Sequence, residues 1–160
     1  MNEPQHSKAV ILAPFGTLLL EANGSHLLNV TLRVEAAGLS APATPLLLEA
    51  ARQFNAYFDD PRHQFSLPLC RQGTLYQNVV WQALCAIPLG SVKSYHLLAG
   101  ELHSGARAVA GACRANRLPI IIPCHRIVAA HGIGGYCGVT GGAVLDIKRW
   151  LLRHEGYEHA

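Results

Sequence analysis

Apolar and polar positions in the N-terminal part of the chain follow the periods of a hairpin and of one helix. Residues 16–22 and 27–34 are β-prone and flank Asn23-Gly24, a dipeptide typical of tight turns, so they predict two antiparallel strands. Apolar residues then recur at helical spacing from Leu46 to Phe58. A further strand is predicted over residues 65–69. This order of elements predicts a small sheet with one helix.

Helical patterns dominate after residue 72, where the composition shifts. Thr74 and Gln77 fit a capping box at the start of one helix. The inward face of this helix is predicted to hold Val80, Trp81, Leu84 and Cys85. Shorter helices are predicted over 95–102 and 106–115, joined by a turn with a glycine, which is typical of a helix-turn-helix. A last helix carries a stripe of Val144, Ile147, Trp150, Leu151 and His154.

The helix predicted over residues 106–115 consists almost entirely of small residues. Only Arg107, Val109 and Arg114 are larger. Such a surface lets the helix backbone come close to its neighbour. That neighbour is either another helix or a nucleic acid, because the minor groove is only about 6 Å wide and excludes bulky side chains.

Composition and charge narrow the class of protein. Half of the 160 residues are apolar and 14% are charged, which excludes a disordered chain. No apolar run approaches the roughly 18 residues of a membrane span, and no signal-peptide pattern is present near Met1, so we expect a soluble, cytoplasmic protein. We predict two domains, residues 1–71 and 72–160.

Residues 1–80 carry 5 Lys and Arg against 6 Asp and Glu, while residues 81–160 carry 8 against 4. A basic C-terminal half suits an anionic partner but is also ordinary for a surface.

The five cysteines predict reduced thiols and no structural metal site. Their number is odd and no two are spaced as in C-x-x-C. Cys124 stands out because it follows the buried-looking segment 118–123 and precedes His125 and Arg126. A thiol needs a base or a positive neighbour to become a nucleophile. The alternative is an inert, buried cysteine.

The segment around Cys124 resembles a known active-site signature. Residues 120–128, Ile-Ile-Ile-Pro-Cys-His-Arg-Ile-Val, are similar to the signature of O6-alkylguanine-DNA alkyltransferases. Further matches follow in the family's order at Gly73–Gln77 with Val80-Trp81, Ile87–Gly90, Ser94-Tyr95, Arg107–Val109, Asn116, Gly134–Tyr136 and Lys148–Gly156. The resemblance spans most of the chain. It implies an α/β fold in which a small sheet-plus-helix domain of the ribonuclease H-like type precedes a mostly helical, winged helix-turn-helix domain.

The same resemblance implies repair of alkylated DNA without a cofactor. The alkyl group of O6-alkylguanine, or of O4-alkylthymine, in double-stranded DNA would move irreversibly to Cys124, once per molecule. His125 would act as a base through a water, with Glu155 orienting it. Asn116 would brace the turn that carries the cysteine. Tyr95 would crowd the target phosphate and supply a proton to the leaving guanine.

The resemblance also assigns DNA contacts and a base pocket. A monomer would bind the minor groove and flip the damaged nucleotide out of the stack. DNA contacts are expected from Tyr95, Ala106, Arg107, Gly111 and Arg114, with Arg107 filling the gap left by the base. The pocket is expected to be lined by Trp81, Ile127, Tyr136 and Cys137.

Two departures from the family pattern touch these surfaces. The chain is about two residues shorter between Tyr95 and Arg107, and about five residues longer between Tyr136 and Lys148, where loops tolerate insertions. Two other functions remain open from the sequence. A lesion-binding protein of the alkyltransferase-like kind would bind without repair, although such proteins lack the cysteine. A cysteine hydrolase would turn over an ester or peptide without DNA.

Overall fold

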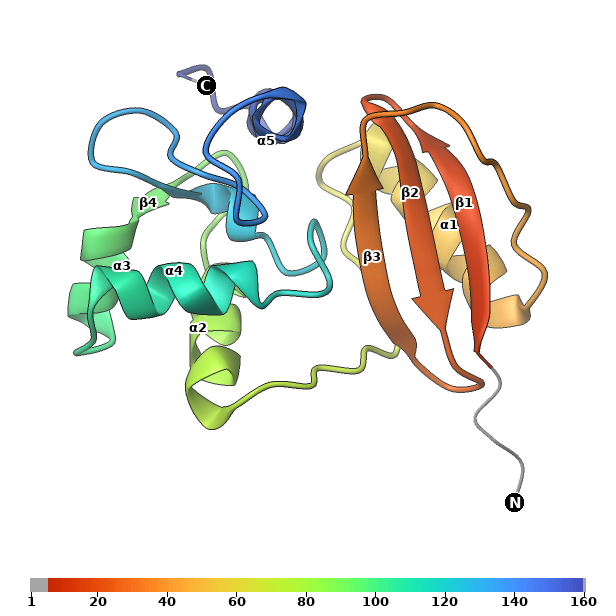
Figure 1. Ribbon diagram of the computed structural model, residues 1–160, viewed down its shortest axis with the longest axis horizontal. Coiled ribbons are helices and arrows are strands. Elements are labelled where there is room, and N and C mark those ends of the chain that lie inside the picture. The colour runs from red at the N-terminus through yellow and green to blue at the C-terminus, as the bar shows by residue number, and fades with distance from the viewer. Residues whose placement is uncertain (1–5, 160) are drawn as a thin grey trace. The chain divides into compact units, whose positions relative to one another are not determined.

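The computed structural model describes residues 6–159, and the chain divides into two compact units, Met1–Arg71 and Gln72–Ala160 (Figure 1). The first unit holds a sheet and one helix, and the second is mostly helical.

The sheet of the first unit is an antiparallel meander of three strands. β1 (Ser7–Ala13), β2 (Gly16–Ala22) and β3 (Leu27–Arg33) lie in the order β1-β2-β3. The predicted hairpin is therefore confirmed as β2 and β3. Sequence analysis missed β1, because the turn that joins it to β2, Pro14-Phe15, carries no Asn-Gly signal.

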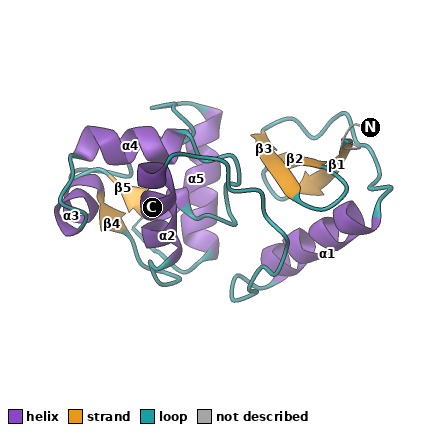
Figure 2. Ribbon diagram, turned by 90° about the horizontal axis from the view of Figure 1, so that it is seen from below, coloured by secondary structure: helices purple, strands orange, loops and turns teal. Residues whose placement is uncertain are grey.

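One helix, α1 (Pro45–Asp59), lies along a face of this sheet (Figure 2). Thr44 caps its first turn by accepting from the Leu47 N–H. Its buried residues recur at helical spacing, which confirms the predicted helix; they are Leu47, Ala50, Ala51, Gln53, Phe54 and Tyr57. The core of this unit is thus one helix face against one sheet face.

The strand predicted over residues 65–69 does not form. The Ser66 N–H donates to the Gln53 Oε1 at 2.8 Å, and the Ser66 carbonyl accepts from the Gln53 Nε2 at 3.2 Å. A side chain of α1 therefore replaces the neighbouring strand as the partner of this backbone. Pro68 has no N–H to donate, and pairing is limited to one bridge between Leu69 and Leu27.

The second unit arranges helices around a very short parallel sheet. Its elements are α2 (Leu75–Cys85), β4 (Lys93–Ser94), α3 (Tyr95–Glu101), α4 (Ala106–Arg114), the 3₁₀ turn η1 (Cys124–Arg126), β5 (Ile127–Val128) and α5 (Ala143–His154). α4 packs against both α2 and α3, while η1 packs against α2 and α5 (Figure 1). η1 is therefore held between the first and last helices of the unit.

The predicted capping box and most of the inward face of α2 are confirmed. Thr74 and Gln77 exchange both capping hydrogen bonds. The indole N–H of Trp81 donates to the Ala112 carbonyl at 2.8 Å and so ties α2 to α4. The prediction for Cys85 is wrong, because the helix ends there and Ile87, just beyond it, fills the core while Cys85 is exposed.

The predicted stripe of α5 is only partly correct. Ile147 and Leu151 are buried, whereas Trp150 and His154 are half-buried and stack on each other with ring centroids 4.6 Å apart. The rest of the buried face is formed by Leu145, Lys148 and Leu152. A lysine thus occupies a core position that the apolar pattern alone would not assign to it.

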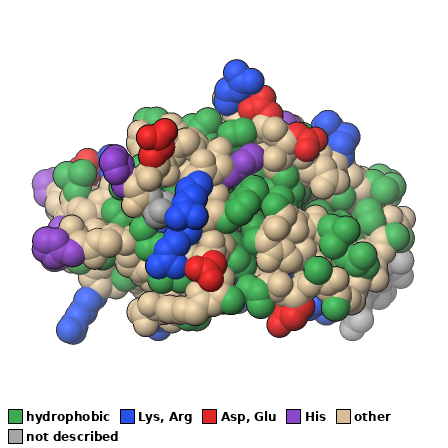
Figure 3. Space-filling model, turned by 90° about the horizontal axis from the view of Figure 1, so that it is seen from above, with side chains coloured by type: hydrophobic (Ala, Val, Ile, Leu, Met, Phe, Trp, Pro, Cys, Tyr) green, Lys and Arg blue, Asp and Glu red, His purple; other side chains and the backbone are tan. Residues whose placement is uncertain are grey.

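Basic and acidic side chains are interspersed on the face drawn in Figure 3, with uncharged atoms between them. In the described part of the chain, no helix is both long and apolar enough to cross a membrane.

Candidate active site

A braced turn places Cys124 at the start of η1. The Asn116 side chain spans this turn, because its Oδ1 accepts from the Leu118 N–H and its Nδ2 donates to the Ile122 carbonyl, both at 2.9 Å. The same Nδ2 lies 3.3 Å from the Cys124 Sγ. Asn116 therefore fixes the backbone before the cysteine and also contacts its thiol.

The backbone inside this turn is strained. Ile120 has φ of 74°, a conformation that costs a β-branched residue roughly 1–3 kcal/mol. The apolar segment around it is largely buried, as the sequence predicted. Burial of these apolar side chains and the hydrogen bonds of Asn116 offset the strain and hold one backbone path toward Cys124.

His125, directly after the cysteine, is fully buried and bonded to Glu155. Its Nε2 lies 2.5 Å from the Glu155 Oε1. Arg126 donates two hydrogen bonds to the same carboxylate, from Nε to Oε1 at 3.0 Å and from Nη2 to Oε2 at 2.8 Å. Its Nη1 donates to the Ile87 carbonyl. Glu155 thus links two successive residues of η1 to the end of α5.

The protonation states follow from this geometry. Burial acts to raise the pKa of Glu155, but hydrogen bonds from His125 and Arg126 outweigh it and lower the pKa to about 2. Burial lowers the pKa of His125, only partly countered by Glu155, so the imidazole is neutral near pH 7. The ionised carboxylate can only accept, so the His125 proton sits on Nε2. Its Nδ1 is then a buried acceptor with no partner among the described residues.

Cys124 rests as a thiol in this environment. Burial raises its pKa, while the Asn116 hydrogen bond and the Lys148 charge act in the opposite direction. A thiol is a weak nucleophile, so a base must remove its proton during the reaction. The unpartnered Nδ1 of His125 is the base that this site offers.

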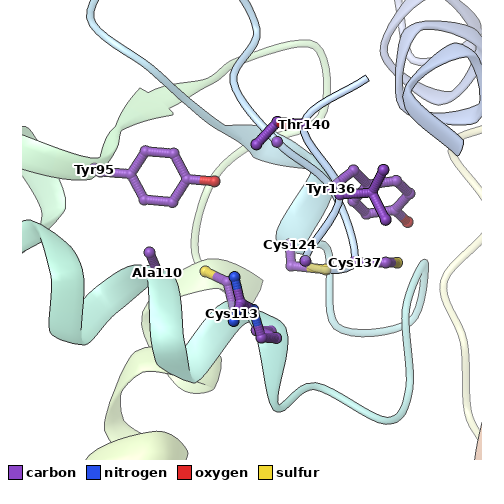
Figure 4. A pocket seen from close by; sticks show the side chains of 11 residues that line it. Tyr95, Ala110, Cys113, Cys124, Tyr136, Cys137 and Thr140 are labelled. Atoms are coloured by element: carbon purple, nitrogen blue, oxygen red, sulfur yellow. The ribbon is translucent and has the colours of Figure 1, made fainter. Parts of the chain in front are cut away.

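The thiol faces a pocket of about 230 Å³ (Figure 4). That is below the roughly 300–1,000 Å³ of pockets for drug-sized ligands, so it suits a group of one or two rings. The Tyr95 hydroxyl points into it, and burial raises the Tyr95 pKa to about 12, which keeps its proton in place. The walls come from α3, α4 and the loop before α5: Tyr95, Ala110, Cys113, Arg114, Gly135, Tyr136, Cys137, Gly138, Val139 and Thr140.

A buried lysine of α5 holds the loop that forms one wall. Lys148 Nζ donates to the carbonyls of Ile127 (2.6 Å), Ile133 (2.6 Å) and Gly135 (2.8 Å). Burial lowers its pKa to about 8. Sequence reasoning gave this residue no role. The available signal was its place in the stripe with Val144 and Leu151, where a charged residue needs buried partners.

α4 exposes the small residues and the arginine that the sequence analysis assigned to DNA. Arg107 and Gly111 are exposed, and a side chain built at Gly111 would meet nothing within 4 Å. Ala106 is half-buried at the start of the helix. Arg114 lies at the other end of α4 and lines the pocket.

Two residues assigned to the pocket lie elsewhere. Trp81 belongs to the core, where its indole N–H is used by α4. Ile127 is fully buried in β5. Tyr136 and Cys137 do line the pocket, whereas the lining residue Cys113 was missed. Its position in a helix of small residues was the available signal.

Among residues 6–159, no group of three or more His, Cys, Asp or Glu side chains is arranged to hold a metal ion. The reactive groups of the site are the Cys124 thiol, the neutral His125 imidazole, the Glu155 carboxylate and the Tyr95 phenol.

Comparison with known proteins identifies the family. The model described as "6-O-methylguanine DNA methyltransferase, DNA binding domain" matches residues 75–157. The chain belongs to the 6-O-methylguanine DNA methyltransferase family. The match to this methyltransferase family contains every residue of the site, from Tyr95 to Glu155.

Individual relatives cover nearly the whole chain. A methylated-DNA–protein-cysteine methyltransferase of Methanosarcina barkeri is 36% identical over 91% of this chain and 94% of its own length. The human protein of the same name is 36% identical over 91% of this chain and 78% of its own. The solved structure of Mycobacterium tuberculosis OGT in complex with DNA is similar at a TM-score of 0.77, with 35% identity and coverage of 92% and 91% of the two chains.

Proposed function

We propose that this protein repairs DNA by moving the alkyl group of O6-alkylguanine, and of O4-alkylthymine, to Cys124. The observation that carries the proposal is the Cys124 thiol, which contacts Asn116 and lines a pocket, followed directly in a chain of the 6-O-methylguanine DNA methyltransferase family by His125. The His125 Nε2 bonds to Glu155, and its Nδ1 has no partner among the described residues.

The proton path follows from the protonation states. His125 Nδ1 removes the Cys124 proton through one bridging water, and Glu155 stabilises the imidazolium that forms. The thiolate sulfur attacks the alkyl carbon and forms a C–S bond as the C–O6 bond breaks. Guanine leaves with the electron pair and takes a proton from the Tyr95 hydroxyl, which faces the pocket. The proton that His125 took from Cys124 then returns to the Tyr95 oxygen through water, so both side chains end neutral.

The product limits the protein to one turnover. A thioether on Cys124 is stable to hydrolysis, and no described side chain at the pocket offers an activated water that would cleave it. Each molecule therefore removes one alkyl group and is consumed. No cofactor takes part.

Damaged bases reach the pocket by flipping. The O6 atom of a stacked guanine is out of reach of a buried thiol, and extrusion costs a few kcal/mol. We propose that α3 and α4 form a winged helix-turn-helix, that the small residues of α4 enter the minor groove, and that Arg107 fills the space left by the base. The exposure of Arg107 and Gly111 supports this placement.

The two units are proposed to be two domains, 1–71 and 72–160. The meander with α1 suits a small ribonuclease H-like domain, and the second unit carries the whole site. We propose a monomer in the cytoplasm, a reducing compartment in which five free cysteines are expected.

The test is uptake of labelled methyl from a duplex with one O6-methylguanine. Cys124→Ala should abolish uptake while duplex binding stays within about threefold, because the buried thiol makes no contact that an exposed DNA surface needs. Cys113→Ala is the matched control and should still accept the label on Cys124. Label on Cys113 or Cys137 in the parent protein would overturn the assignment, and binding without uptake would identify a lesion-binding protein.

A further inference from the structure

Three cysteines line one pocket, and the proposed alkyl transfer uses only one of them. Cys113 comes from α4, Cys124 from η1 and Cys137 from the loop before α5 (Figure 4). Burial raises the pKa of both Cys113 and Cys137 to about 12, and charge on nearby Cys124 adds to the shift. A second thiol that lines the pocket of a nucleophilic cysteine can itself react, so it can have a role beyond lining the pocket.

Cys137 is held in a conformation that suits another residue better. Tyr136 and Val139 exchange backbone hydrogen bonds at 2.8 and 2.9 Å around a two-residue turn. Cys137 has φ of 50° and Gly138 has φ of 78°, the pattern of a type I′ turn, whose first central position favours Asn, Asp or Gly. Gly138 is fixed by space as well, because a Cβ there would lie 3.0 Å from Arg114 Nε. The strained residue of this turn thus carries a thiol to the mouth of the pocket.

Cys113 and Cys137 differ in how they can approach Cys124. Cys113 sits inside the last turn of α4, where the helical backbone fixes its position, and it is half-buried. Cys137 is exposed and lies in a loop whose Gly141 and Gly142 meet no neighbour within 4 Å of a built Cβ. A disulfide needs Cα atoms about 4.4–6.8 Å apart, so one partner must be free to adjust. Cys137 lies in a loop, so its backbone can shift once the two hydrogen bonds that close its turn open, whereas Cys113 would have to leave its helix. The exposure of Cys137 also admits a reductant.

We infer that Cys137 is a resolving thiol, which forms a reversible disulfide with Cys124 when the pocket meets a peroxide. Oxidation to a disulfide is a reaction open to two thiols that line the same pocket.

The steps balance with a hydroperoxide as the oxidant. His125 takes the Cys124 proton, the thiolate attacks one peroxide oxygen, the O–O bond breaks, and the hydroxide that leaves takes up that proton to form water. Sulfur is oxidised by two electrons to a sulfenic acid. The Cys137 sulfur then attacks the Cys124 sulfur, an S–S bond forms, the S–O bond breaks, and the Cys137 proton leaves with the oxygen as a second water. An external dithiol restores both thiols by exchange.

Such a bond would matter for a protein that acts once. Without a resolving thiol, the sulfenic acid of Cys124 goes on to the sulfinic acid, which ordinary reductants do not reverse. The disulfide would block alkyl transfer for a time but keep the molecule usable. The inference does not depend on the proposed DNA substrate, because disulfide formation is read by mass alone.

The experiment treats the full-length protein with hydrogen peroxide and follows it by intact mass and peptide mapping. The parent should lose two hydrogen atoms and yield one linked peptide pair, Cys124 with Cys137, reversed by dithiothreitol. Cys137→Ser should instead gain two oxygen atoms at Cys124 and regain less than about a tenth of its own untreated methyl uptake after dithiothreitol. Cys113→Ser is the matched control and should form the link as the parent does.

Each variant is compared with its own untreated sample, since both positions line the pocket. A link between Cys124 and Cys113, a link between two protein molecules, or equal rates of sulfinic acid formation in parent and Cys137→Ser would overturn the inference. If the untreated parent protein takes up no methyl group, but the treated parent forms the Cys124–Cys137 disulfide, the result counts against the proposed function and not against this inference.

Discussion

At the scale of single residues, one carboxylate decides which nitrogen of His125 is the base. Glu155 is ionised and accepts from Nε2, which leaves Nδ1 free to take a proton. Arg126 holds the same carboxylate through two hydrogen bonds. The relay is therefore a fixed chain of donors and acceptors that ends at an unpartnered acceptor on the residue after Cys124.

Glu155→Gln should slow methyl transfer by at least about tenfold, because the uncharged amide stabilises the imidazolium less.

The rate of methyl transfer should also depend on pH in a defined direction. His125 must be neutral to act, so transfer in the parent should fall as pH drops below 6.5 through its lowered pKa. Glu155 raises the His125 pKa, so its loss should move this acid limb to lower pH. Single-turnover rates from pH 5 to 8 check this, and an unshifted limb at the parental rate would remove Glu155 from the relay.

Asn116→Ala should reduce the free energy of unfolding by about 1–3 kcal/mol, because a backbone N–H and a carbonyl of a half-buried turn lose their partner. Urea unfolding measures the change. Asn78→Ala is the control, since the Asn78 amide bonds only to exposed helix-start carbonyls, and it should change stability by less than about 0.5 kcal/mol. Similar losses in both variants would show that the turn does not depend on Asn116.

At the scale of elements, the local periodic signals were sufficient for the hairpin and for all the larger helices. α1 and α2 carry their caps and apolar spacing within a few residues, so sequence reasoning places them. Residues 65–69 fail because their backbone partner is the side chain of Gln53, which no local pattern reveals. The part that Lys148 plays in holding the loop was missed for a similar reason, because its three carbonyl partners lie 13 to 21 residues away in the sequence.

The candidate site divides along the same line. The cluster of Cys124, His125, Asn116 and Glu155 was predicted through the family resemblance, and the structure brings these side chains together. Trp81 and Ile127 were predicted to line the pocket, but both are buried in the core. In the sequence, an apolar residue that lines a pocket cannot be told from one that packs in the core nearby. Only the packing of the folded chain decides which apolar residues line the pocket and which belong to the core.

α4 gives a prediction that separates DNA handling from chemistry. Arg107 is exposed and lies outside the pocket lining, so Arg107→Ala should slow methyl transfer from duplex DNA by at least about tenfold while changing reaction with free O6-benzylguanine by less than about twofold. Single-turnover rates on both substrates provide the measurement. Equal losses on the two substrates would assign Arg107 to the fold or the pocket.

At the scale of the whole molecule, the site belongs to one unit. Every catalytic candidate lies in Gln72–Ala160, which carries 8 Lys and Arg against 4 Asp and Glu, whereas Met1–Arg71 carries 5 against 6. An anionic duplex is therefore favoured by the unit that holds the pocket. Binding should weaken as salt rises from 50 to 200 mM, by roughly tenfold or more for a few phosphate contacts, as titration of a labelled duplex can measure.

The central claim is that Cys124 takes one alkyl group and keeps it. Intact-mass spectrometry after incubation with excess duplex bearing one O6-methylguanine tests it most directly, followed by mapping of the modified peptide. We predict a gain of one methyl group per protein molecule, located on Cys124, with no further repair after one equivalent. A methyl group on Cys113 or Cys137, repair beyond one equivalent, or an unchanged mass with the lesion still bound would contradict the account.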